Sequence, residues 1–347
     1  MQGVRTAVRQ LSAASAATAR KIVIARHFQG DPKPDDFRLE EEALPPLKDG
    51  QILCEAAYLS VDPYQRAYTH RHKVGQPMIG SQVALIVESR APEFPVGRYV
   101  VGYWGWRDRT VAETRANRDM WAPMLVPELG DLPLSLALGV LGMPGNTAYF
   151  GLLEICHPRP GEVAVVSGAA GAVGSIVGQI ARIKGCKVIG FAGSDSKVNW
   201  LRDELGFDHA FNYKTVDVGK ALKEVAPDGV DIYFDNVGGQ QSSAILYKMR
   251  TGGRISVCGS ISSYNDTKIP SAPILQPAMV FNELKMEGFL VNRWLDRWDE
   301  GIKQNMQWIK EGKLKYKETV TEGFENMPKA FIGMLKGENL GKAVVKV

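Results

Sequence analysis

The chain has 347 residues, of which 45% are hydrophobic and 23% charged, and its formal net charge is +4. This length predicts two domains, and the composition is typical of a soluble globular protein. Arg5, Arg9 and Arg20 supply three of the positive charges, which leaves +1 for the rest of the chain. We therefore expect neither a nucleic acid nor a membrane as a partner, because the charge is nearly balanced and no apolar run could span a bilayer.

The first twenty residues differ in composition from the rest of the chain, because they are rich in Arg, Ser and Ala and contain no acidic residue. This composition resembles a mitochondrial transit peptide, and the alternative is an extension with no targeting role. The chain is accordingly predicted to be cytoplasmic, or mitochondrial if residues 1–20 are a true transit peptide.

The stretch from residue 21 to about 141 is predicted to be mostly β-structure. Short β-branched and apolar runs alternate there with Gly and Pro, which is typical of strands separated by turns. Residues 135–149 are apolar and helix-like, with an interruption at Met143-Pro144-Gly145. The expected strands cover residues 21–26, 51–59, 83–89 and 98–103.

A glycine-containing loop follows the apolar run at residues 162–166. Gly168, Gly171 and Gly174 lie three residues apart, and an apolar helical pattern begins directly after them. This strand, loop and helix predict a βαβ unit whose helix N-terminus binds a pyrophosphate, with residues 171–174 close to it. Ala169 and Ala170 depart from the usual G-x-G-x-x-G pattern, so a tight turn without a ligand is the alternative.

Strands and helices alternate regularly from residue 161 to about 310. Six strands in this arrangement predict a doubly wound parallel sheet, with ligands at the carboxyl ends of the strands. The later pattern, which includes an expected strand at 316–321, a helix near 324–334 and a strand at 342–347, is predicted to return to the N-terminal β-structure. The six expected strands cover residues 162–166, 187–192, 209–212, 230–235, 254–258 and 285–291.

The end of the second strand of this series predicts which dinucleotide binds. NAD-preferring folds place an acidic residue there, whereas this strand ends in Gly193 and Ser194, with Lys197 shortly after. A lysine attracts a 2′-phosphate, so we expect NADP(H), bound by these residues and by Tyr213. The alternative is that Asp195 caps the next helix and that Lys197 is solvated.

The four cysteines lie at least thirty residues apart, so neither a disulfide framework nor a paired metal site is expected. His70 and His72 have no nearby third ligand, which favours a solvated loop over a metal site. A reducing compartment is consistent with these isolated cysteines.

Several motifs together resemble the prostaglandin reductase 1 family of zinc-independent medium-chain dehydrogenases/reductases. They are LSVDPYQR (59–66), LGMPGNTAYFGLLEI (141–155), AAGAVGSIVGQIA (169–181), FNYKT (211–215), FDNVGG (234–239), CGSISSYN (258–265) and GFENMPKAFIGMLKGENLGK (323–342). The resemblance covers residues 21–347. It implies an α/β fold with a GroES-like substrate domain (21–141 and 313–347) and a Rossmann NADP-binding domain (142–312).

The resemblance also implies a homodimer, the cofactor NADPH and the reduction of carbon–carbon double bonds conjugated to a ketone or aldehyde. Tyr64 is implied to lie near the substrate. The implied cofactor residues are Gly171, Ala172, Val173, Gly174, Gly193, Ser194, Lys197, Tyr213, Asn236, Cys258, Gly259, Ser260, Ile261, Ser262, Ser263, Tyr264, Phe289, Leu290, Val291 and Asn339. The tract 101–124 is unusually aromatic, with Trp104, Trp106 and Trp121. The chain departs from the family there, so the resemblance implies no particular substrate preference.

Zinc relatives in this superfamily use Cys and His ligands, and the corresponding segments here read Asp62-Pro63-Tyr64 and Gly80-Ser81-Gln82. We therefore predict no metal, and a hydrogen-bond donor must stabilise the enolate instead. Tyr264 is the predicted catalytic donor, because a phenol stays protonated at neutral pH; the alternative is that it only packs against the cofactor. Two other functions stay open, an NADPH quinone oxidoreductase and a non-catalytic NADPH-binding protein.

Overall fold

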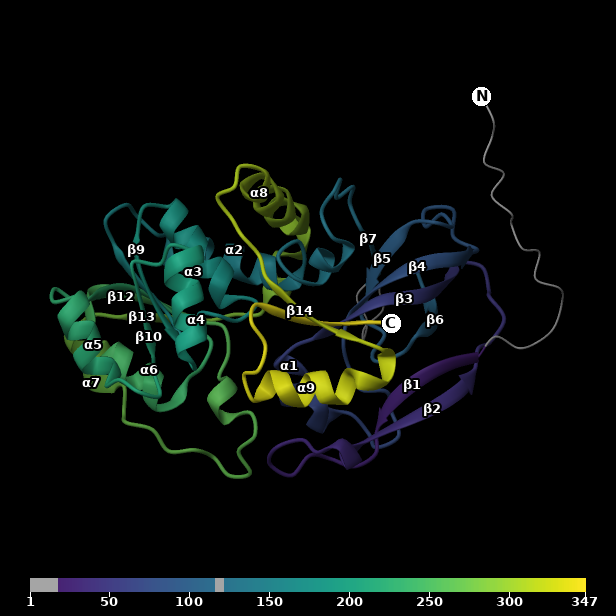
Figure 1. Ribbon diagram of the computed structural model, residues 1–347, viewed down its shortest axis with the longest axis horizontal. Helices are drawn as coiled ribbons and strands as arrows, with labels where there is room; N and C mark the ends of the chain where they lie inside the picture. Colours follow the sequence, from purple (N-terminus) through teal and green to yellow (C-terminus); the bar gives the residue numbers. More distant parts are fainter. Residues whose placement is uncertain (1–17, 116–121) are drawn as a thin grey trace.

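The computed structural model describes residues 18–115 and 122–347, and two large β-sheets dominate it. Figure 1 shows the parallel sheet with its helices on one side of the molecule and the mostly antiparallel sheet on the other. The predicted transit segment up to residue 17, and Trp121 of the aromatic tract, lie outside the described residues. No helix of the described chain is long and apolar enough to cross a membrane.

The antiparallel part is a seven-stranded sheet with the order β14-β15-β3-β4-β5-β7, to which β6 adds by pairing with β3. β15 pairs with β3, so the end of the chain does return to the N-terminal sheet, as expected from the sequence. A two-stranded ribbon, β1-β2, lies beside it. The strands are β1 (Thr18–Ile24), β2 (Phe37–Ala43), β3 (Gln51–Val61), β4 (Gln82–Ser89), β5 (Tyr99–Gly102), β6 (Arg109–Glu113), β7 (Met124–Leu125), β14 (Glu318–Glu322) and β15 (Lys342–Lys346).

The second sheet is a six-stranded parallel sheet with the order β10-β9-β8-β11-β12-β13. Numbered along the chain, this order is 3-2-1-4-5-6, the classical arrangement of a dinucleotide-binding fold. The doubly wound sheet predicted from the strand–helix alternation is therefore confirmed. Its strands are β8 (Val163–Val166), β9 (Lys187–Ala192), β10 (His209–Asn212), β11 (Val230–Asp235), β12 (Met249–Val257) and β13 (Lys285–Gly288).

Helices cover both faces of the parallel sheet, and their apolar sides form its two cores. Pro144 lies in the first turn of α2, so the predicted interruption at Met143-Pro144-Gly145 is the start of this helix. The helices are α1 (Tyr64–Tyr68), α2 (Met143–Cys156), α3 (Gly174–Ile183), α4 (Asp195–Asn199), α5 (Val218–Val225), α6 (Gly239–Leu246), α7 (Gln276–Phe281), α8 (Trp298–Lys310) and α9 (Met327–Leu335).

Several predicted element boundaries differ from the structure, and three of the differences have a visible structural reason. β1 begins at Thr18, and Arg20 within it forms an ion pair with Asp108 at 2.7 Å, so residues 18–20 belong to the folded part. β13 ends at Gly288 rather than at residue 291, because the Phe289 ring turns inward toward Phe234 and Trp294. The last helix pattern divides into a 3₁₀ turn at Phe324–Asn326 followed by α9.

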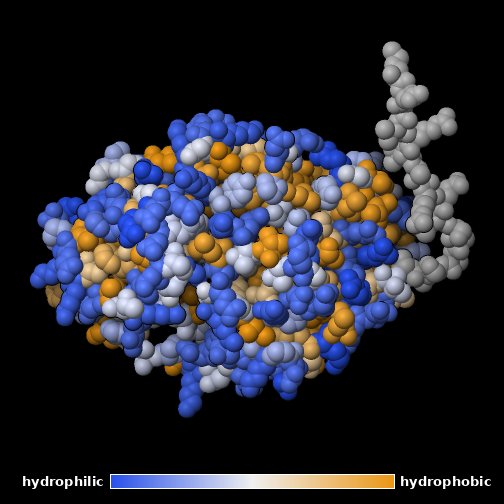
Figure 2. Space-filling model, in the orientation of Figure 1, coloured by the Kyte–Doolittle hydropathy of each residue, from blue (hydrophilic) through white to orange (hydrophobic). Residues whose placement is uncertain are grey.

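Figure 2 shows hydrophilic residues over most of the face it presents, with smaller hydrophobic areas between them. Scattered apolar residues of this kind are normal on protein surfaces. Larger exposed side chains occur near the edge strand β13. They are Val280, Phe281, Met286 and Leu290.

Candidate active site

A cavity of about 1900 Å³ lies at the carboxyl ends of the parallel strands and extends to the residues around α1, next to the antiparallel sheet. The glycine loop after β8, the loops after β11 and β12 and the segment after α9 all contribute to its wall. A cavity at this edge of a doubly wound sheet is where such folds bind their ligands. Its volume exceeds that of most single-ligand pockets, so it has room for a cofactor and a substrate together.

The glycine loop is so tightly folded that side chains at Gly171 and Gly174 would crowd the Gly168 carbonyl oxygen. A Cβ at Gly174 would lie 2.4 Å from the Gly168 carbonyl oxygen, and one at Gly171 would lie 3.2 Å from the same atom. Gly168 itself has φ = +57°, a conformation that favours glycine. α3 begins at Gly174, and residues 171–174 line the cavity, so the N-terminus of this helix faces the cavity. Helix N-termini attract anions.

A pair of lysines lies at the end of β9 and β10. The Lys197 Nζ donates to the Gly337 carbonyl oxygen at 2.6 Å, and burial followed by the nearby Lys214 charge lowers the pKa of Lys197. Both lysines line the cavity with Tyr213, and no ion pair joins either of them to a carboxylate in the described chain. Gly193 leaves space here, because a Cβ would lie 3.3 Å from the Tyr213 hydroxyl.

Asp195, two residues before Lys197, forms a hydrogen bond with a different side chain. Its Oδ1 accepts a hydrogen bond from Asn212 Nδ2 at 2.8 Å. Ser194 rather than Asp195 caps α4, by accepting from the Lys197 backbone N–H. Ser194 does not line the cavity, in contrast to its predicted place around the phosphate.

The buried carboxylate of Asp235 holds the loop after β11. Its Oδ1 accepts from the Tyr233 hydroxyl at 2.7 Å, from the Ser167 hydroxyl at 3.1 Å and from the Gly238 N–H at 2.9 Å. Asn236 then donates from Nδ2 to the Ser167 carbonyl oxygen at 2.7 Å. This network joins the start of the glycine loop to the next loop, and so it fixes two walls of the cavity relative to each other.

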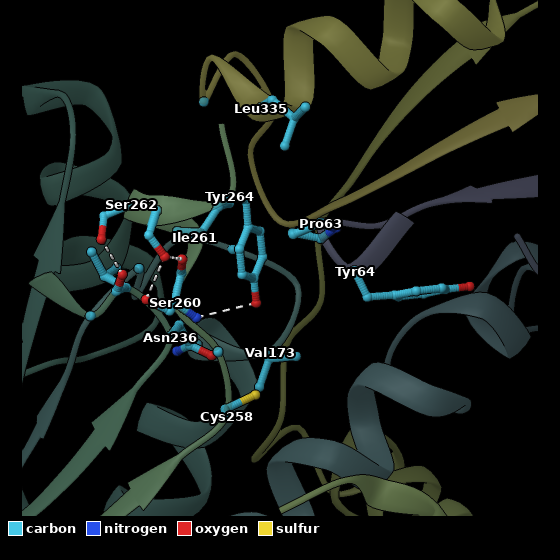
Figure 3. A pocket seen from close by; sticks show the side chains of 18 of the residues that line it. Pro63, Tyr64, Val173, Asn236, Cys258, Ser260, Ile261, Ser262, Tyr264 and Leu335 are labelled. Carbon is cyan, nitrogen blue, oxygen red and sulfur yellow. Dashed lines mark hydrogen bonds between the residues drawn. The ribbon is translucent and has the colours of Figure 1, made fainter. Parts of the chain in front are cut away.

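Tyr264 lies at the end of the loop after β12, with its ring facing the cavity (Figure 3). Its hydroxyl accepts a hydrogen bond from the Ser260 backbone N–H at 3.2 Å. Because the hydroxyl is the acceptor in this contact, its own proton stays free to be donated to a ligand. Burial is the main cause that raises its pKa, so the phenol stays protonated at neutral pH.

Tyr64 differs from Tyr264 in the direction of its hydroxyl. Both rings line the cavity, but Figure 3 shows Tyr64 extending away from Tyr264, with its oxygen on the far side. That hydroxyl is buried and forms no hydrogen bond of good geometry, and burial raises its pKa well above the ordinary value. Tyr64 is thus placed as a wall of the cavity.

The adjacent Asp62 is paired with a lysine. The Lys342 Nζ lies 2.9 Å from Asp62 Oδ1, and these side chains are only 4% and 5% exposed. An ammonium group therefore already neutralises the carboxylate at one of the segments where zinc relatives carry ligands. The described residues contain no group of three His, Cys, Asp or Glu side chains able to hold a metal, so a zinc site of three or four ligands does not fit them.

Comparison with known proteins identifies the family of this chain. Residues 20–119 match the family model described as "N-terminal domain of oxidoreductase", and residues 172–311 match "Zinc-binding dehydrogenase". "Prostaglandin reductase 1" of Bos taurus is 52% identical over 94% of this chain and 99% of its own length. The chain belongs to the prostaglandin reductase 1 family.

Two further relatives show how broad this family is. The "2-alkenal reductase (NADP(+)-dependent)" of Nicotiana tabacum is 38% identical over 94% of this chain and 97% of its own length. The crystal structure of CurA in complex with NADPH, from Vibrio vulnificus, superposes with a TM-score of 0.86 at 40% identity, over 94% of this chain and 99% of that one. The resemblance stated from the sequence motifs is confirmed by these matches.

The structure brings nearly all the residues implied by the family resemblance to one cavity. Of the described candidates, Ser194 alone does not line it. In the aromatic tract, Trp104 and Trp106 are buried in the cores, and Tyr103 is the residue that faces the cavity. Sequence reasoning missed Lys214, Tyr103 and Asp62 as wall residues, although Lys214 directly follows Tyr213 in a motif that carried the resemblance.

Proposed function

We propose that this protein reduces the carbon–carbon double bond of α,β-unsaturated ketones and aldehydes, with NADP(H) as its cofactor. The observation that carries this proposal is the Tyr264 hydroxyl, whose proton is free and which lies in the cavity between the two sheets. The names of the prostaglandin and 2-alkenal reductases in the family support the same substrate class.

The residues of the cavity fit a phosphorylated dinucleotide. In this proposal the loop at residues 171–174 holds the pyrophosphate, and Lys197, Tyr213 and Lys214 surround the 2′-phosphate. The closely packed glycines and the two cations without carboxylate partners support this placement. Ser194 caps α4 and does not line the cavity, so this proposal gives it no contact with the phosphate. The remaining contacts are assigned to Asn236, to residues 258–264, to residues 289–291 and to Asn339.

The bound cofactor supplies a hydride to the β-carbon of the substrate. Negative charge then develops on the carbonyl oxygen, and a hydrogen-bond donor at that oxygen lowers the barrier. Tyr264 is the proposed donor, while Tyr64 shapes the pocket because its hydroxyl points elsewhere. A proton from water or from a side chain completes the reaction at the α-carbon, so one NADPH and one proton are consumed for each bond reduced.

The experiment is a screen of NADPH oxidation by the purified protein over enals, enones and quinones. Enals and enones should be reduced to the saturated carbonyl compounds, with quinones slower. Rapid turnover of quinones alone would favour the alternative function of a quinone oxidoreductase. NADPH binding without oxidation by any of these compounds would favour the non-catalytic alternative.

We also propose that two copies of this chain associate through the edge of the parallel sheet. β13 lies at the end of the strand order, so among residues 18–115 and 122–347 no strand pairs with one side of its backbone. Near it, Phe281 is 80% exposed and Val280 is 71% exposed, which favours burial against a second copy. Light scattering should give a dimer that Phe281→Glu weakens, whereas a monomeric wild-type protein would contradict the proposal.

The compartment is proposed as cytoplasmic, or mitochondrial if the first residues act as a transit peptide. Arg20 is committed to the fold through its ion pair with Asp108, so Arg5 and Arg9 are the basic residues that targeting would use. Imaging the full chain and its Arg5→Ala/Arg9→Ala variant in cells would decide between the two. Mitochondrial signal that the variant loses would show import, and a diffuse signal in both would show the cytoplasm.

A further inference from the structure

The loop that carries Tyr264 is joined to the substrate domain by one asparagine. Asn265 Oδ1 accepts a hydrogen bond from Arg66 Nε at 2.9 Å, and Asn265 Nδ2 donates to Asp31 Oδ1 at 2.6 Å. Arg66 belongs to α1 and Asp31 to the segment between β1 and β2. The amide of Asn265 thus uses its acceptor and its donor on two different elements of the other domain.

The Arg66 side chain is held by further contacts within its own domain. Its second guanidinium nitrogen donates to the Gly30 carbonyl oxygen at 2.9 Å, and its guanidinium carbon lies 5.3 Å from the centre of the Phe28 ring. Phe28 in turn packs against the Phe37 and Phe331 rings of the substrate-domain core. Through Arg66, Asn265 is therefore connected to packed aromatic residues, whereas its other partner, Asp31, is an exposed side chain.

Backbone hydrogen bonds between residues near in sequence close the loop on itself. The Tyr264 N–H bonds to the Ile261 carbonyl oxygen, and the Asp266 N–H bonds to the Ser263 carbonyl oxygen. A cavity of about 460 Å³ separates part of this loop from Phe28 and Arg66, so side-chain packing is incomplete there. Hydrogen bonds across this gap, rather than close packing, set the distance between the loop and the substrate domain.

From this arrangement we infer that Asn265 is a positioning residue for the reaction. Its hydrogen bonds to Asp31 and Arg66 form a latch between the loop that carries Tyr264 and the substrate domain. The latch holds the Tyr264 hydroxyl at a fixed place relative to the substrate, which lies against the other domain. A hydroxyl displaced by about an ångström loses much of its catalytic effect, because the donor must meet the developing charge. This inference rests on the proposed role of Tyr264.

The test exchanges the two partners of the shorter hydrogen bond. Asn265→Asp keeps an acceptor for Arg66 but sets two carboxylates against each other, so the loop should part from Asp31. Adding Asp31→Asn restores a donor opposite the new carboxylate, with the roles of the two positions reversed. We expect Asn265→Asp to lower kcat about tenfold or more with little change in the Kd of NADPH, and the double variant to regain most of the loss.

A double-mutant cycle with Tyr264→Phe separates positioning from a general structural effect. If Asn265 acts through the Tyr264 hydroxyl, Asn265→Asp should cost little further kcat once that hydroxyl is gone. Hydrogen exchange of residues 261–266 should rise in Asn265→Asp and return in the double variant. Asn326→Asp, which changes an amide that contacts the Glu322 carbonyl oxygen, is the matched control and should leave kcat unchanged.

The outcomes distinguish this inference from the function on which it rests. An unchanged kcat in Tyr264→Phe would overturn the proposed role of Tyr264. A large loss in Tyr264→Phe with an unchanged kcat in Asn265→Asp would overturn the latch alone. A loss in Asn265→Asp that Asp31→Asn does not restore, or that adds fully to that of Tyr264→Phe, would also contradict it.

Discussion

The Tyr264 hydroxyl combines two properties that a neutral donor needs. It accepts from the Ser260 N–H, which leaves its proton available, and burial raises its pKa above the ordinary value of 10.0. The donor form is therefore present across the neutral pH range and would be lost only in strongly alkaline solution. Tyr64 differs in direction, because its hydroxyl points away from Tyr264 (Figure 3).

Tyr264→Phe removes this hydroxyl and keeps the ring. We expect kcat and kcat/KM to fall together by about tenfold or more, because the lost interaction acts mainly on the transition state. The Kd of NADPH should change little. Steady-state kinetics and a fluorescence titration measure the two quantities. Tyr64→Phe is the control and should cost less, whereas a variant that only raises the KM for NADPH would make Tyr264 a cofactor-packing residue.

Lys197 is the second residue whose chemistry can be tested alone. Lys197→Ala should weaken NADPH binding by roughly 1–3 kcal/mol, as expected for a charged hydrogen bond, and should affect NADH little. Lys214→Ala should act in the same direction, while Lys310→Ala on α8 should have no effect. Titration calorimetry with both cofactors measures the difference. An equal loss for NADPH and NADH would refute the assignment.

The lowered pKa of Lys197 also gives a pH dependence. The ammonium form attracts the phosphate, and this form is lost as the pH rises through the lysine pKa. Burial, with Lys214, lowers that pKa below its ordinary value of 10.5. The preference for NADPH over NADH should therefore decline with rising pH earlier than an ordinary lysine would allow.

At the scale of elements, the glycine loop and α3 act together. Gly174→Ala would place a Cβ 2.4 Å from the Gly168 carbonyl oxygen, so the loop must shift away from its position at the start of α3. Thermal unfolding and an NADPH titration should both show a loss. At Gly288 nothing lies within 4 Å of a Cβ, so Gly288→Ala serves as the control. An unchanged Kd of NADPH in Gly174→Ala would contradict the proposal that this loop holds the pyrophosphate.

The sequence predicted the elements of the parallel sheet well, and the reason is physical. Strands buried on both faces read as short apolar runs, and the helices between them show an amphipathic period. β2 was missed because it is rich in charged residues and includes three consecutive glutamates at 40–42, of which Glu42 pairs with Lys21 of β1. β7, with only two residues, carries too little pattern to be recognised.

The site was predictable where local motifs define it and unpredictable where tertiary contacts do. The glycine loop and Tyr264 lie within continuous motifs, so the resemblance identified them. The Asp62–Lys342 pair joins residues 280 positions apart, and the Arg66–Asn265 contact joins residues 199 apart. No local signal marks such pairs, because each member alone is an ordinary polar residue.

At the scale of the whole molecule, the returning strand β15 is anchored by a buried charge pair. The Lys342 Nζ donates to the Val61 carbonyl oxygen at 2.7 Å as well as to Asp62. Lys342→Met would leave the Asp62 carboxylate buried without its partner, so we expect a loss of about 3–5 kcal/mol in the free energy of unfolding. Urea denaturation measures this loss, and adding Asp62→Asn should recover part of it.

That rescue identifies the cause of the loss. If the Asp62→Asn/Lys342→Met protein is no more stable than Lys342→Met alone, then the loss reflects the missing lysine stem rather than the stranded carboxylate.

The protein as a whole is predicted to act without a metal. Treatment with a chelator should leave its reductase activity unchanged, because Lys342 already pairs with Asp62 at one of the segments corresponding to zinc ligands. Metal analysis of the purified protein provides the control. Zinc present in a one-to-one ratio, with activity lost on its removal and regained on its return, would refute this prediction.

The most direct test of the central claim is to follow where the hydride goes. The protein is incubated with an enone and NADPH deuterated at the transferred position, and the product is examined by NMR and mass spectrometry. Our account predicts a saturated ketone with one deuterium on the former β-carbon and the carbonyl group intact. An allylic alcohol with deuterium on the carbonyl carbon would contradict it, as would an enone recovered unchanged.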